Sequence, residues 1–216
     1  MKTRVKICGI TSIEDAQTVC DSGVDALGLV FYEKSPRNVS IETAKSIRAN
    51  TPPFITTVGL FLDASKQFVD SVLASVSLDL LQFHGSESPE YCASFNRPYI
   101  KVVGMKSINS DDEFKAYADQ FNDAKGFLVD SHATGKAGGT GQTFDWSDVP
   151  QSYDKPIILA GGLNPDNIAD AISQVPVYGV DLSSGVESQA GIKDKQKVTQ
   201  LMNEIHRIEC SRNNRK

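Results

Sequence analysis

The 216-residue sequence lacks the features that mark several specialised classes of protein. No apolar run approaches the roughly 20 residues of a membrane-spanning helix, and no long apolar stretch follows the first residues. We therefore expect neither a membrane partner nor a signal peptide. Its four cysteines form no CxxC pair, which argues against a zinc site or a disulfide framework and favours a cytoplasmic protein with reduced thiols.

Positive charge is also scarce. The chain has 22 Lys and Arg residues against 27 Asp and Glu residues, a net charge of −5, so we expect no nucleic acid partner. This balance does not exclude a small anionic ligand, because local loops decide such binding. No cluster of residues has metal-ligand spacing, so no metal is expected. The length suits one domain with a sizeable core.

Short apolar runs bounded by Gly and Pro alternate with segments of helical periodicity along the whole chain. Six strands are expected at residues 4–9, 25–31, 55–62, 79–85, 99–103 and 126–130, and two more within 155–163 and 178–187. Helices are expected to begin near residues 12, 40, 65, 86, 110, 165 and 193, the last ending near 208. This alternation predicts an α/β fold, a single (β/α)8 TIM barrel of eight parallel strands with outer helices. The barrel is expected to span 1–210, followed by a polar C-terminal tail at 211–216.

The competing fold is a doubly wound open sheet, which usually carries a glycine fingerprint after its first strand. Here that strand ends in Cys8-Gly9-Ile10-Thr11, which lacks the spacing. Gly139-Thr140-Gly141 comes closest, but Phe144 takes the place of the third glycine and the segment follows a late strand. The barrel is therefore favoured.

Two turns poor in side chains follow the seventh and eighth strands. They are Gly161-Gly162 and Ser183-Ser184-Gly185. Open backbone N–H groups in such turns bind phosphate, and a barrel usually holds phosphate at these two loops. The glycine-rich loop around Gly139 and Gly141 is either a lid over a ligand or an ordinary mobile loop.

Reactive side chains in a barrel lie at the C-terminal ends of its strands. Cys8 ends the first strand, where a thiolate could act as a nucleophile or general base, although an inert buried cysteine is the commoner case. Asp130 ends the sixth strand. It is either a general acid with a raised pKa, or a cap or salt-bridge partner of the next loop. Arg37 either clamps a carboxylate or lies exposed on the surface. Asp63 is placed like these residues and is less informative.

Two further polar residues allow alternatives. His84, which follows Gln82 at the end of the fourth strand, is either a base or a hydrogen-bond partner of its loop. Asp181 either points into the mouth of the barrel and holds Cys8 or backbone groups, or orders the turn at Ser183.

Nine stretches together carry a resemblance to a known family. They are Val5–Gly9, Ser35–Arg37, Val58–Phe61, Leu81–Gly85, Asp130–Ser131, Gly138–Gly141, Phe144–Trp146, Leu159–Leu163 and Val180–Glu187. In this order, across nearly the whole chain, they resemble the phosphoribosylanthranilate isomerase family of tryptophan biosynthesis. Phe83, where the family often has Leu, is a conservative departure.

The resemblance implies an Amadori rearrangement of an aminoaldose to a ketose, without redox chemistry or a cofactor. It implies Asp130 as general acid, Cys8 as general base, and Arg37 near the anthranilate, and we expect Gln82, His84 and Asp181 to bind substrate. The residues expected to hold the phosphate are Gly139, Gly141, Gly161, Gly162, Ser183, Ser184 and Gly185. A small phosphosugar is the only partner expected, for a monomer or a homodimer.

Three other functions fit the sequence less well. Indole-glycerol-phosphate synthase would show catalytic Lys and Glu at strand ends. A ribulose-phosphate epimerase would show metal-binding His and Asp on several strands, whereas the three histidines here are scattered. A catalytically silent phosphometabolite-binding protein would not need both Cys8 and Asp130, and a turnover assay separates it from an enzyme.

Overall fold

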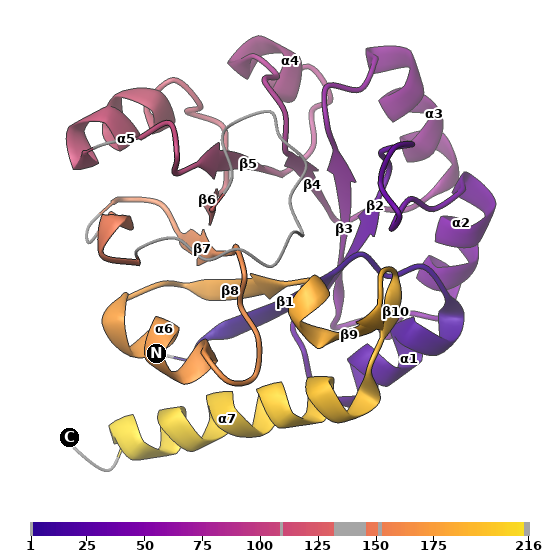
Figure 1. Cartoon of the computed structure of the whole chain (residues 1–216). Helices are drawn as coiled ribbons and strands as arrows, with labels where there is room; N and C mark the ends of the chain where they lie inside the picture. Colours follow the sequence, from indigo (N-terminus) through magenta and orange to yellow (C-terminus); the bar gives the residue numbers. More distant parts are fainter. Residues whose placement is uncertain (1, 109, 132–145, 151–152, 214–216) are drawn as a thin grey trace.

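Eight short apolar segments form parallel strands that close into a ring. In a computed structural model, residues 2–108, 110–131, 146–150 and 153–213 are described. The strands follow one another round the ring in chain order, and the eighth pairs with the first. Figure 1 looks into this ring and shows the helices outside it. The expected fold class, a (β/α)8 barrel, is confirmed.

The elements keep the expected alternation. The strands are β1 (Arg4–Cys8), β2 (Ala26–Val30), β3 (Thr56–Phe61), β4 (Leu80–Phe83), β5 (Tyr99–Gly104), β6 (Phe127–Asp130), β7 (Ile157–Leu159) and β8 (Gly179–Leu182). The α-helices in the described part of the chain are α1 (Ile13–Asp21), α2 (Ile41–Ala49), α3 (Lys66–Ser75), α4 (Pro89–Ala93), α5 (Asp111–Ala118), α6 (Ile168–Gln174) and α7 (Lys195–Asn213). The 3₁₀ turns η1 (Trp146–Asp148) and η2 (Ser184–Val186) and the hairpin of β9 (Glu187–Gln189) and β10 (Ile192–Lys193) complete the fold.

Serine side chains start the first five helices. Each accepts a hydrogen bond from the backbone N–H three residues later, which satisfies a donor that the helix itself leaves open. The capping residues are Ser12, Ser40, Ser65, Ser88 and Ser110. Losing one such cap typically costs about 1 kcal/mol. These local signals explain why most helix starts agree with the sequence.

The start of α4 differs from the prediction, which placed it near Ser86. The helix begins at Pro89 because Glu87 is drawn inward before it. The Glu87 carboxylate accepts hydrogen bonds from the backbone N–H of Asp63 (2.9 Å) and from that of Gly85 (2.9 Å). It also pairs with the buried ammonium of Lys101 at 2.8 Å. This turn fixes the end of β4, where His84 lies.

The C-terminal region differs in two further ways. The hairpin β9–β10 was not predicted, and it precedes α7, which begins at Lys195 and not at Lys193. The helix then runs past Ile208 to Asn213, into the segment expected as a tail. There the Arg212 side chain donates a hydrogen bond to the carbonyl oxygen of Ile172. The helix therefore extends beyond its apolar pattern, with α7 packed along α6 and α1 (Figure 1).

Each strand presents alternate residues to two different cores. On β5, Tyr99 and Val103 belong to the large apolar layer between strands and helices, whereas Ile100 and Val102 belong to a small cluster inside the ring with Leu128. The ring is therefore filled with side chains and is not a pore. No helix in the described ranges is both long and apolar enough to cross a membrane.

Candidate active site

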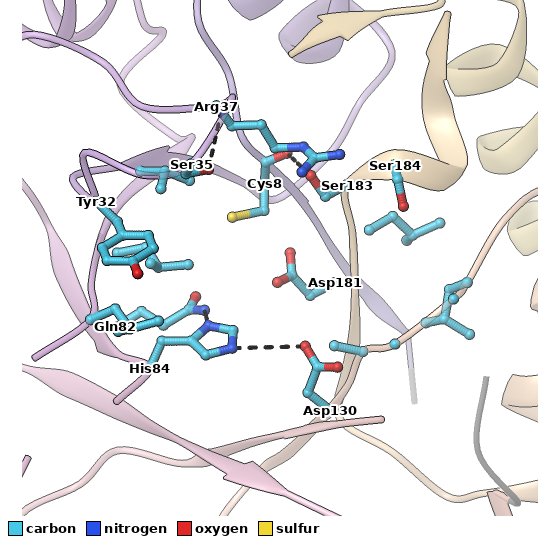
Figure 2. Close-up of a pocket in the computed structure, with 18 residues that line it drawn as sticks. Cys8, Tyr32, Ser35, Arg37, Gln82, His84, Asp130, Asp181, Ser183 and Ser184 are labelled. Atoms are coloured by element: carbon cyan, nitrogen blue, oxygen red, sulfur yellow. Dashed lines mark hydrogen bonds and ion pairs between the residues drawn. The ribbon is translucent and has the colours of Figure 1, made fainter. Parts of the chain in front are cut away.

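A cavity opens at the end of the ring where the strands terminate (Figure 2). It measures about 730 Å³ including its open mouth. It collects most of the residues singled out in the sequence: Cys8, Arg37, Gln82, His84, Asp130, Gly161, Gly162, Asp181, Ser183 and Ser184. Apolar side chains, among them Val30, Leu60 and Leu163, line the rest. The cavity thus combines convergent polar groups with an apolar wall, as ligand sites do.

Cys8 and Asp130 lie on opposite sides of this cavity, at the ends of β1 and β6 (Figure 2). Both are buried. One carboxylate oxygen of Asp130 accepts a hydrogen bond from the Ser131 hydroxyl at 3.2 Å, and the other lies 3.9 Å from His84 Nε2. His84 Nδ1 in turn lies 3.5 Å from the side-chain nitrogen of Gln82. Gln82, His84 and Asp130, at the ends of β4 and β6 or just after them, therefore lie next to one another along one wall of the cavity.

The end of β1 is fixed by contacts from the far end of the chain. The carbonyl oxygen of Cys8 accepts hydrogen bonds from the Ser183 hydroxyl (3.0 Å) and from the ammonium of Lys193 (2.7 Å). Burial raises the pKa of the Cys8 thiol. The backbone at Cys8 is therefore held in place, and the buried thiol needs nearby positive charge before it can ionise.

Arg37 reaches the cavity over Gly9 and is held by Glu187. Its guanidinium donates two hydrogen bonds to the Glu187 carboxylate, at 2.8 and 2.7 Å. Gly9 has φ 79°, and a Cβ there would lie 2.5 Å from Arg37 Cδ, so glycine makes room for the arginine. Lys193 also pairs with Glu187, at 2.6 Å. Burial alone would raise the pKa of Glu187, but Arg37 and Lys193 together lower it. Two buried cations thus share one carboxylate beside the cavity.

The turns after β7 and β8 border the cavity with backbone. Gly161 and Gly162 have φ of 88° and 65°, the left-handed conformation that favours glycine. A Cβ on Gly161 would lie 2.7 Å from the backbone nitrogen of Ser131, so the first turn packs tightly against the end of β6. Gly185 does not line the cavity; it packs against the carbonyl of Leu163, joining the two turns.

Some residues from the sequence lie elsewhere. Gly139 and Gly141, expected to bind phosphate, fall outside the described residues. Asp63 does not line the cavity; its carboxylate accepts a hydrogen bond from the backbone N–H of Ser86. Within the ranges that the structure describes, no group of three or more His, Cys, Asp or Glu side chains is arranged to hold a metal ion.

Three charged residues at the site were missed. Lys6 is inside the ring, and sequence could have found it, because it lies two residues before Cys8 on the same strand face. Glu187 and Lys193 carried no comparable signal. Glu187 contacts Arg37 across 150 residues of chain, and Lys193 contacts the Cys8 carbonyl across 185.

Comparison with known proteins agrees with this geometry. The family model described as N-(5'phosphoribosyl)anthranilate (PRA) isomerase matches residues 5–204. The chain belongs to this isomerase family. An N-(5'-phosphoribosyl)anthranilate isomerase from Pseudomonas syringae pv. syringae is 50% identical over 203 residues, covering 94% of this chain and 97% of the relative.

Solved structures of PRA isomerases share the fold. The phosphoribosyl anthranilate isomerase of Thermus thermophilus superposes with a TM-score of 0.85 at 31% identity, covering 95% of this chain and all (100%) of that one. Another phosphoribosyl anthranilate isomerase was solved in complex with reduced 1-(o-carboxyphenylamino)-1-deoxyribulose 5-phosphate. It has a TM-score of 0.80 at 35% identity, and the match covers 94% of this chain and 98% of that chain. These findings confirm the family and the enzyme class expected from the sequence, and decide against the synthase and the epimerase.

Proposed function

We propose that this PRA isomerase family member converts N-(5'-phosphoribosyl)anthranilate into 1-(2-carboxyphenylamino)-1-deoxyribulose 5-phosphate in tryptophan biosynthesis, with Asp130 as general acid and Cys8 as general base. The observation that carries the assignment is the position of the two groups, on opposite walls of one cavity (Figure 2). The reaction needs a proton donor at the ring oxygen of the sugar and a base at C2 of the same sugar.

The proton steps divide between the two residues. Asp130 gives a proton to the furanose oxygen, and the C1–O bond breaks as the anilinic nitrogen forms a Schiff base. The Cys8 thiolate then takes the proton from C2, and the electron pair left behind gives an enolamine. Tautomerisation moves the hydroxyl proton of C2 to C1 and yields the ketone. The proton gained by Cys8 replaces, through solvent, the one lost by Asp130, so no redox partner is consumed.

The turns after β7 and β8 are assigned to the phosphate. Gly161, Gly162, Ser183 and Ser184 present backbone and hydroxyl groups on one side of the cavity. Fixing the phosphate there places the pentose between Cys8 and the opposite wall, so that binding energy far from C2 serves orientation. Gly139, Gly141 and Gly185 remain assigned to the phosphate on the family resemblance.

Arg37 is assigned to the anthranilate carboxylate. Glu187 engages Nε and Nη2 of its guanidinium, which fixes the plane of the group beside the cavity. A guanidinium held in this way loses little conformational freedom when it binds a second carboxylate. Gln82, His84 and Asp181 line the remaining wall and are assigned to the sugar.

Whether the enzyme is a monomer or a homodimer stays a prediction. A cytoplasmic location also stays a proposal. It is supported by the four cysteines, all of which are free thiols.

The test is a direct assay with freshly prepared phosphoribosylanthranilate, following loss of its fluorescence. We expect loss proportional to enzyme concentration, with product of unchanged mass on chromatography. Chromatography also quantifies hydrolysis to anthranilate, which is the background reaction. Substrate that disappears no faster than in buffer, or only by hydrolysis, would reject the proposed function.

A further inference from the structure

An ion pair lies inside the ring, next to Cys8. Lys6 on β1 and Asp181 on β8 are register partners on neighbouring strands, and the Lys6 ammonium lies 2.9 Å from an Asp181 carboxylate oxygen. Their side chains are only 7% and 8% exposed. Burying two charges is costly, so a pair that the fold keeps at this depth calls for a function.

The ammonium also adjoins the thiol. Lys6 and Cys8 point to the same side of β1, because side chains two residues apart share a strand face. On β2, Gly28 is the register partner of Cys8, and a Cβ there would lie 2.7 Å from the Cys8 sulfur and 3.1 Å from the Lys6 nitrogen. The two groups therefore converge on the space that Gly28 leaves open, which makes the ammonium and the thiol neighbours inside the ring.

Charged groups approach the sulfur from several elements. Lys6 comes from β1, Asp181 from β8, Lys193 from β10 and Arg37 from the loop after β2, while His84 and Asp130 face it from β4 and β6. Burial dominates and raises the pKa of the thiol. Among the cations, Lys6 acts most strongly in the opposite direction, and Asp181 works against it.

Lys6 itself stays charged. Burial pulls the pKa of Lys6 down, but Asp181 and the neighbouring thiol raise it above its usual value. The ammonium is therefore a fixed positive charge with one carboxylate partner, and its remaining donors are free to turn toward sulfur.

We propose that Lys6 is a positioning residue of the isomerase, whose ammonium stabilises the Cys8 thiolate from inside the ring. Asp181 holds that ammonium in place, and Gly28 leaves room for both groups. This inference rests on the proposed function for the use of the thiolate as a base. It assigns to Asp181 a role through Lys6, in addition to its place on the cavity wall.

A second buried pair in the molecule supplies the matched control. Lys101 and Glu87 are 2.8 Å apart, with side chains 0% and 3% exposed, but Lys101 points to the outer face of β5, toward the helices. It does not line the cavity. A lysine-to-methionine change at either position removes one buried ammonium and keeps most of the side-chain volume. Lys101 also donates hydrogen bonds to the carbonyl oxygens of Phe83 and Gly85, so Lys101→Met disturbs the fold while it removes no charge next to Cys8.

The experiment measures ionisation of Cys8 directly. Lys6→Met, Lys6→Arg, Lys101→Met and the wild type are alkylated with iodoacetamide across a pH series, and mass spectrometry follows the Cys8 peptide, with the exposed Cys210 as internal reference. We expect Lys6→Met to raise the pH midpoint of Cys8 alkylation by roughly one to three units, the range for loss of an adjacent opposite charge. Lys6→Arg, which keeps the charge, and Lys101→Met should keep the wild-type midpoint.

Turnover should depend on the ionisation of the Cys8 thiol. At pH 7 the kcat of Lys6→Met is expected to fall roughly tenfold for each unit of midpoint shift, and to recover as pH rises. A purely structural role would lower stability without moving the midpoint. If Lys6→Met does not fold, Lys6→Met combined with Asp181→Asn replaces the pair by neutral side chains and should still show a raised midpoint, because Lys6 outweighs Asp181.

The outcomes separate this inference from the proposed function. A wild type that does not isomerise the substrate rejects the function, whatever the thiol does. A wild type that isomerises it while the Cys8 midpoint of Lys6→Met, or of the double variant, equals that of the wild type overturns the role of Lys6.

Discussion

On β4 and β6 the inner face of the barrel has an apolar lower layer and a polar upper layer, and the same two strands supply both. On β6, Leu128 is buried in the apolar cluster, and Asp130, two residues further along the same face, lines the cavity. On β4, Leu80 and Gln82 repeat this step. The comparison teaches that on β4 and β6 one step of two residues along a strand separates stability from chemistry, because the C-terminal strand ends border the cavity.

The largest expected effect is at the upper layer. Cys8→Ala and Asp130→Asn should each lower kcat roughly 10²–10⁴-fold, because each removes a proton-transfer group. Substrate affinity and the unfolding midpoint should stay near those of the wild type, since the changed groups border a cavity and not the core. Single-turnover kinetics, ligand titration and thermal unfolding measure the three quantities.

Cys92→Ala is the matched control for the cysteine. Cys92 is buried, but it lies on α4 and does not line the cavity. This variant should keep its kcat while losing some stability. Near-normal turnover in Cys8→Ala would remove Cys8 from the mechanism, and the same result in Asp130→Asn would remove the acid.

In the lower layer the expected loss is one of stability. Leu128→Ala leaves a cavity in the filled ring and should reduce the free energy of unfolding by about 2–5 kcal/mol. The folded fraction should keep its kcat within a few-fold, which denaturant unfolding and an assay at low temperature can establish. Leu73→Ala, half-buried on α3, should cost less. A loss of kcat in folded Leu128→Ala as large as that in Asp130→Asn would break the comparison between the two layers.

Arg37→Ala should have a smaller effect on catalysis. A hydrogen bond to a charged group is worth about 1.5–3 kcal/mol, so kcat/KM should fall roughly 10- to 100-fold. The matched test uses a phosphoribosylamine made from aniline, which has no carboxylate. If Arg37 binds the carboxylate, wild type and variant should use this analogue equally well; an equal loss on both substrates would contradict that role.

The smallest expected effect concerns acid stability. The pKa of Glu187 is lower in the folded state than its ordinary value of 4.5. Its contribution is therefore fully present above that pH, and it is lost as pH falls through the lower, folded pKa. Urea unfolding from pH 6 to pH 3 should show a shallower decline in Glu187→Gln than in the wild type. Glu204→Gln, which removes a half-buried carboxylate paired with the exposed Arg207, serves as control, and parallel curves for Glu187→Gln and the wild type would contradict the prediction.

Local pattern was enough to predict the barrel and many of its cavity residues. Strands appear as apolar runs, and serine caps start helices, so Cys8 and Asp130 could be placed at strand ends from neighbouring residues alone. The hairpin at residues 187–193 escaped because the segment is short and has no alternating apolar pattern. The contacts of Glu187 with Arg37 and of Lys193 with Cys8 were not predicted, because they join distant parts of the chain and a pattern of neighbouring residues cannot show them.

Closure of the ring between β1 and β8 also bears on how the protein is made. Lys6 meets Asp181 across 175 residues, and Lys193 reaches the Cys8 carbonyl from still further along the chain. During synthesis, the edge of β1 that pairs with β8 therefore stays open until nearly all the other strands have been made. A nascent chain that stops short of residue 181 carries the cysteine but lacks the carboxylate that orders the ammonium behind it. Catalytic competence should consequently arise in a single late step, after the ribosome has released the last strand, and partial chains should be inert.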